Sequence, residues 1–180
     1  MYLQNGAGQY EEAVKQGLVF SASNQAATTY TLFGNTTATG LILSNPASST
    51  KLLSVVAIGF MKVAAAGAQI DNLVISAGAN TLVSAHTTPL TVQPNNIGLV
   101  PTIGVGLVDA AATLAAAGLI IAPFTATSVS ATATTSVPPP ALVNMNGLFS
   151  VKPGSFIQLA AGFTNTVSGV GSIAWREIDI

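Results

Sequence analysis

The stretch "KLLSVVAIGFMKV", residues 51 to 63, decides the fold class. Successive side chains of a β-strand point to opposite sides, so the stretch can be divided into two faces. One face carries Leu53, Val55, Ala57, Gly59, Met61 and Val63, and the other carries Leu52, Ser54, Val56, Ile58, Phe60 and Lys62. Both faces are largely apolar, which is typical of a strand covered on both sides. The second covering is another sheet or another subunit, and the scarcity of helix signals favours a subunit.

Short β-prone segments separated by turn residues fill most of the remaining chain. They include "LVFSAS", "TTYTLF", "TGLILSNP", "NLVISAG", "TLVSAHTT", "SFIQLAAGF" and "VGSIAWREIDI". Gly34-Asn35, Asn45-Pro46 and Lys152-Pro153-Gly154 supply turn signals between such segments. This pattern predicts an all-β protein, an antiparallel, jelly-roll-like β-sandwich of about eight strands.

The length of 180 residues suits a single domain. We assign residues 17–180 to one β-sandwich domain and residues 1–16 to an N-terminal arm or short helix. Glu11 lies four residues before Lys15, a spacing that supports a helical turn. The N-terminal sequence is polar and has no apolar signal-peptide core, which predicts synthesis in a host cytoplasm without a signal peptide.

Two segments have compositions that favour a conformation other than a β-strand. The alanine-rich run 109–117 favours a helix by propensity, with Asp109 as its N-cap. Pro138-Pro139-Pro140 predicts an extended polyproline piece within a linker.

Charged residues are unusually scarce. They make up 6% of the chain, against roughly 25% in an ordinary soluble domain, and the formal net charge is -1. Such a surface does little to keep molecules apart, which favours stability inside an assembly. The five basic residues are scattered, so we expect no nucleic-acid partner. The apolar run 110–124 is too short and too interrupted for a membrane span, so we expect no membrane partner.

Few residues are candidates for chemistry, and we predict that the protein is not an enzyme and has no cofactor. His86 is the only histidine, so a Ser-His-Asp arrangement would need it together with Asp71 or Asp109. Glu177 and Asp179 share one face of a strand, where paired carboxylates could bind calcium or cleave glycosides. A solvated strand end is the simpler interpretation of that pair. We therefore predict no catalytic, cofactor-binding or metal-binding residue.

Glycine and aromatic motifs have simple structural interpretations. "GVG", residues 104 to 106, and "GVGS", residues 169 to 172, lack the remainder of a phosphate-binding loop, so turn glycines are expected. Trp175, the only tryptophan, could bind a sugar, but packing explains it without further assumption. Val55, Ile58, Phe60 and Trp175 are the candidate anchors of an oligomer interface or of the core.

Several phrases resemble a family of tailed-bacteriophage virion proteins. "GLVFSASNQAATTYTLFGNTTATGLILSNPASSTKLLSVV" is similar to the opening of that family, and "AATLAAAGLIIAPF" is similar to its link into a middle strand. "PPPALVNMNGLFSVKPGSFIQLAAGF" followed by "GSIAWREI" is similar to its ending. The resemblance covers most of the chain from Gly17 onward. It departs at Arg176, where the family usually has glutamate.

The resemblance implies small jelly-roll-like β-sandwich proteins on phage capsids, often trimeric, that act as decoration, cement or head-fibre proteins. It also implies an irregular link, rather than a helix, before the strand "GLIIAPFTATSVS". The expected partners are further copies of this chain in a homotrimer and the major capsid protein, and the expected location is the capsid surface of the virion. The alternative is a fibre or tail domain that binds a glycan or the host surface.

Overall fold

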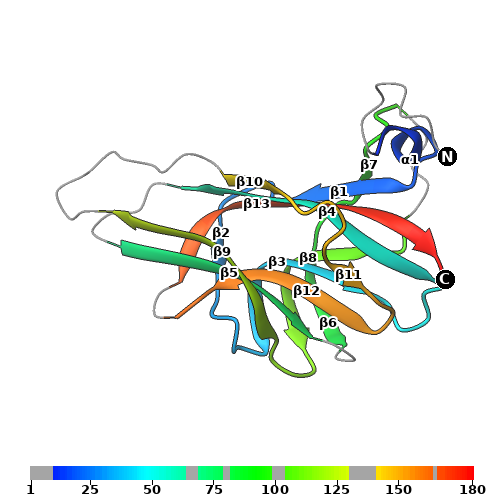
Figure 1. Ribbon diagram of the computed structural model, residues 1–180. Coiled ribbons are helices and arrows are strands. Elements are labelled where there is room, and N and C mark those ends of the chain that lie inside the picture. Colours follow the sequence, from blue (N-terminus) through cyan, green and yellow to red (C-terminus); the bar gives the residue numbers. More distant parts are fainter. Residues whose placement is uncertain (1–9, 64–68, 79–81, 99–103, 130–140, 164–165) are drawn as a thin grey trace.

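The computed structural model describes residues 10–63, 69–78, 82–98, 104–129, 141–163 and 166–180. These residues form one short helix and thirteen strands, arranged in two antiparallel sheets. The two sheets pack face to face (Figure 1). The predicted all-β, antiparallel β-sandwich is therefore confirmed. The polyproline prediction for residues 138–140 lies outside the described residues.

Sheet A has seven strands in the order β10-β4-β13-β1-β7, with β11 paired to β4 and β2 paired to β13. Its strands are β1 Val19–Ser23, β2 Thr28–Tyr30, β4 Lys51–Lys62, β7 Gln93–Pro94, β10 Ala141–Asn144, β11 Ser150–Val151 and β13 Val167–Asp179. The long strands β4 and β13 form its centre and pair along almost their whole length.

Sheet B has six strands in the order β6-β8-β3-β12-β5-β9. Its strands are β3 Thr37–Asn45, β5 Gln69–Gly78, β6 Val83–Pro89, β8 Leu107–Leu114, β9 Leu119–Val129 and β12 Ser155–Ala161. Strands β6 and β9 form the two edges of this sheet.

A β-bulge in β4 changes which residues face the core. Ala57 pairs with Ala174, whereas Val55 pairs with Trp175, so Val56 is an extra residue on β4. Because a bulge shifts the alternation by one, both Val55 and Ile58 are buried, at 0% and 1% exposure. The expectation of two strictly alternating apolar faces along residues 51 to 63 is therefore wrong.

The main core lies between the sheets and is built from large side chains of both. The four candidate anchors Val55, Ile58, Phe60 and Trp175 all belong to it. The Trp175 ring stacks on Phe20 with centroids 6.1 Å apart. Aromatic pairs of this kind add to the stability gained from burial alone. A second, smaller cluster consists of Ala38, Ile42, Ala112, Leu114 and Phe156.

The run 109–117 does not form a helix. Residues 107–114 form strand β8, which pairs with β3 on one side and β6 on the other. Asp109 is therefore a strand residue and not an N-cap. The helix propensity of alanine contributes little free energy. Two rows of interstrand hydrogen bonds and the burial of Ala112 and Leu114 contribute more and favour the strand. The link implied by the resemblance is irregular only at residues 115–118, because residues 111–114 before them belong to β8, and the strand expected after the link is β9.

Helix α1, Glu11–Lys15, is the only helix among the described residues. A Lys15–Glu11 ion pair of 2.7 Å spans it, and Ala13 is its buried residue. The helix lies beside β7 (Figure 1), where Asn96 Nδ2 donates to the Lys15 carbonyl at 3.4 Å. A short helix thus precedes the sandwich.

Candidate functional site

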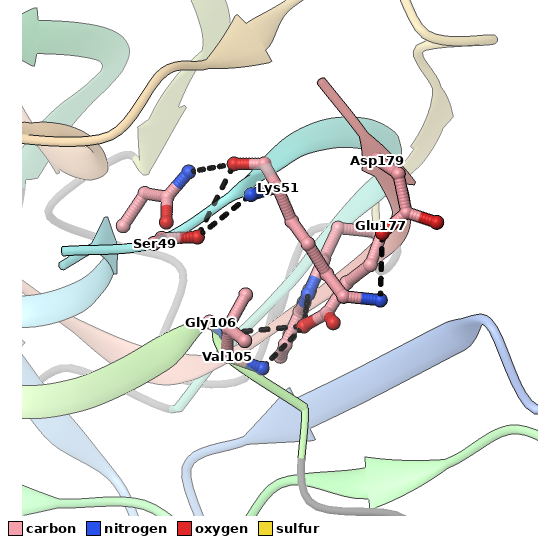
Figure 2. A network of polar contacts seen from close by, with 8 residues as sticks. Ser49, Lys51, Val105, Gly106, Glu177 and Asp179 are labelled. Carbon is pink, nitrogen blue, oxygen red and sulfur yellow. Dashed lines mark hydrogen bonds and ion pairs between the residues drawn. The ribbon is translucent and has the colours of Figure 1, made fainter. Parts of the chain in front are cut away.

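The last strand, β13, brings a buried carboxylate beside the backbone of Val105 and Gly106 (Figure 2). Glu177 is 3% exposed. Its Oε1 accepts hydrogen bonds from the backbone N–H groups of Val105 at 2.7 Å and Gly106 at 3.1 Å. The Trp175 indole N–H also donates to it, at 3.4 Å. The carboxylate therefore satisfies three donors and holds this segment against sheet A.

The close approach explains the "GVG" motif. A Cβ on Gly104 would lie 2.9 Å from Glu177 Oε1, and a Cβ on Gly106 would lie 2.8 Å from Trp175 Nε1. Real Cβ atoms are almost never found at such distances, so only glycine fits at either position. These glycines are required by contact with the Trp-x-Glu sequence of β13.

Glu177 and Asp179 share a strand face as predicted, but their surroundings differ. The Asp179 side chain is 87% exposed, and its Oδ1 lies 3.4 Å from Lys51 Nζ. The interpretation of both carboxylates as a solvated strand end is wrong for Glu177. Among the residues that the structure describes, no group of three or more acidic, histidine or cysteine side chains could hold a metal ion.

A second polar contact in Figure 2 fixes the turn between β3 and β4. Asn45 Nδ2 donates to the carbonyls of Lys51, at 2.7 Å, and Val151, at 2.9 Å. The Ser49 hydroxyl accepts from the Lys51 N–H at 3.0 Å. Asn45-Pro46 is thus a turn signal, and the side chain of Asn45 also joins the two sheets.

The structure brings together His86 and Asp109, two of the three residues considered for a catalytic triad. His86 Nδ1 lies 2.6 Å from Asp109 Oδ2. The Asp109 side chain is fully buried, whereas that of His86 is 35% exposed. Burial raises the pKa of the Asp109 carboxyl, and the contact with His86 partly opposes this rise. No hydroxyl of the described residues hydrogen-bonds to His86, and the side chain of Asp71 lies outside the description.

Trp175 and Tyr30 are unavailable as sugar-stacking platforms, because both are 0% exposed. The Tyr30 hydroxyl donates to Asn24 Oδ1 at 2.8 Å, and burial raises the pKa of Tyr30. Asn24 Oδ1 also accepts from the Gly171 N–H at 3.1 Å. No local sequence pattern predicts this role of Asn24, because asparagine next to Gln25 indicates only a turn.

The outer face of sheet A carries a group of small, uncharged residues, here termed the sheet A patch. Its members are Ser21, Ser23, Ala57, Gly59, Ser172 and Ala174, and register places them in two adjacent rows across β1, β13 and β4. Met61, 48% exposed, and Leu142, 76% exposed, border it. They help to line a shallow hollow of about 200 Å³.

Comparison with known protein families, with curated proteins and with solved structures found no match. In the described part of the chain, no helix has the length and apolar character needed to cross a membrane.

Proposed function

We propose that this chain is a structural virion protein that decorates or cements the capsid of a tailed bacteriophage as a homotrimer. The observation that carries the proposal is the sheet A patch, a group of small, uncharged residues on an outer face that also carries Arg176, in a chain that is only 6% charged. The resemblance to phage virion proteins supplies the biological setting. The β-sandwich fold agrees with that setting.

The patch is chemically suited to contact between identical subunits. Its side chains are hydroxyls, methyl groups and a hydrogen, so two backbones can approach closely across it. Serine hydroxyls can pair across an interface without the cost of burying a charge. Homo-oligomers usually close by symmetry, and in a three-fold ring the patch of each subunit packs against a different surface of the next subunit, so that every patch is covered.

Exposed apolar side chains next to the patch strengthen the argument. Met61 and Leu142 lie at its border and are 48% and 76% exposed. A contiguous apolar area on a monomer is an aggregation liability, and an interface between subunits removes it. We therefore place the subunit contact on sheet A and leave sheet B for the capsid or for solvent.

Substitution within the patch tests the proposal. Ser172→Arg should dissociate the trimer and leave the sandwich folded, because a long cation cannot be buried against a second copy. Thr113→Arg, an exposed residue of β8 in sheet B, is the matched control. Sedimentation equilibrium should give three times the chain mass of 18.0 kDa for the native protein and the control, and the chain mass for Ser172→Arg. A native protein at the single-chain mass would refute the trimer.

A further inference from the structure

The edge strand β6 is weakly held by ordinary packing. Among the described strands it pairs with β8 alone, and its register with β8 shifts at three places. Every residue of β6 after Val83 is exposed. Irregular edge strands of this kind resist pairing with other proteins, but they also open easily.

His86 makes the one side-chain contact from β6 to a buried charge in the described residues. It reaches Asp109 on β8 at 2.6 Å, and the other carboxylate oxygen, Oδ1, is buried without a hydrogen-bond partner. The neighbour of Asp109 on β3 is Ile42, which is itself 0% exposed. A carboxylate in this position has one hydrogen-bonding partner, whereas water would offer several. The stabilisation of its negative charge therefore depends on His86.

The pair is isolated from other charges. Strands β3, β6, β8 and β12 contain no other acidic, basic or tyrosine residue. Its affinity for protons is therefore set by the burial of Asp109 and by the contact between the two side chains.

We propose that His86 and Asp109 form a proton-dependent latch that holds β6 on sheet B. While the pair retains a proton, the Asp109 charge is either neutralised or matched by a cationic imidazole. After that proton is lost, a buried carboxylate faces a neutral ring, and β6 opens more readily.

The direction of the effect follows from linkage. Opening of β6 exposes Asp109 to water, where its carboxyl returns to its ordinary, lower pKa and releases its proton. Rising pH therefore favours the open form, and the latch is tightest at acidic pH. Each unit of difference between the closed and open pKa values changes the opening equilibrium about tenfold.

The first experiment uses the fact that His86 is the only histidine. Nitrogen-15 NMR of the native protein then shows one imidazole, with no need for assignment by mutation. If Asp109 accepts from Nδ1, the neutral ring carries its proton on Nδ1, because the hydrogen bond fixes the tautomer. At a pH where the pair has lost the proton that closes the latch, a neutral ring protonated on Nε2 would overturn the proposal.

The second experiment measures amide hydrogen exchange of β6 from about pH 4, near the ordinary pKa of a carboxyl, to about pH 8, because the pKa of Asp109 is raised. Asp109→Asn and His86→Asn keep the shape of a hydrogen-bonding pair and remove one titrating group each. After correction for intrinsic exchange, protection of β6 in the native protein should fall as the pH rises across the range. Both variants should lose most of that dependence.

The opposite edge strand β9 serves as an internal control, because it does not contact the pair. Its protection should follow the same pH profile in all three proteins. Equal pH dependence of β6 in the native protein and in Asp109→Asn would overturn the latch, as would a change shared by β6 and β9. If a variant fails to fold, the tautomer measurement on the native protein still decides.

Discussion

At the scale of single residues, Glu177 shows how a charged side chain can serve structure in a nearly uncharged protein. Its Oε1 receives the amides of Val105 and Gly106 and the indole N–H of Trp175. Hydrogen bonds to an ionised acceptor are stronger than those between neutral groups. One carboxylate thus connects β13 to a segment about 70 residues earlier in the chain.

Removal of this acceptor should be costly. Glu177→Ala leaves buried N–H groups unpaired, and we expect a loss of about 3 kcal/mol in the free energy of unfolding. Glu177→Gln keeps an oxygen acceptor and should lose about 1 kcal/mol. Asp179→Asn, two residues away and exposed, should change it by less than about 0.5 kcal/mol. Chemical denaturation measures all three, and equal losses for Glu177→Ala and Asp179→Asn would contradict the assigned role.

At the scale of elements, the bulge in β4 is the feature that strict alternation could not reveal. Residues 51 to 63 are apolar at many positions. Either set of alternate residues could therefore face the core, and a shift of the alternation by one residue leaves no trace in the sequence pattern. The extra residue, Val56, lies where Trp175 pairs with Val55. The bulge leaves the small Ala57 and Gly59 on the outer face and keeps the large side chains inside.

The bulge can be tested with aspartate substitutions. Val55→Asp and Ile58→Asp should both abolish the native fold, because each places an unpaired charge in the core. In a strictly alternating strand, one of the two would be tolerated. Ala57→Asp on the sheet A patch should keep the fold and lose trimer formation. Circular dichroism and sedimentation distinguish these results, and a well-folded Ile58→Asp protein would show that the bulge is misplaced.

Sequence analysis was most reliable for the fold and least reliable for the contacts between distant segments. Turn residues and short apolar runs predicted the sandwich, because the alternation of apolar residues and the positions of turns are local properties of the sequence. The helix predicted for 109–117 was wrong, because pairing of β8 with β3 and β6 overrides alanine propensity. The burial of Glu177 and its bonds to 105–106 depend on contacts that no local pattern contains.

At the scale of the whole molecule, the shortage of charged residues leads to a prediction about how the protein attaches to a capsid. If the protein binds a capsid through shape and neutral hydrogen bonds, salt should weaken the binding little, because salt screens only charges. Binding to purified capsids should therefore differ by less than about threefold between low and moderate salt. Release by moderate salt, with the fold retained, would contradict attachment without ion pairs.

We propose that this chain is a structural protein of a phage capsid, and a cryo-EM map of the virion that carries it is the decisive test. We expect density for the two-sheet sandwich on the outside of the capsid shell, in clusters of three that meet through sheet A. Density for the chain on the tail or its fibres alone, or contacts through sheet B alone within a cluster, would contradict it.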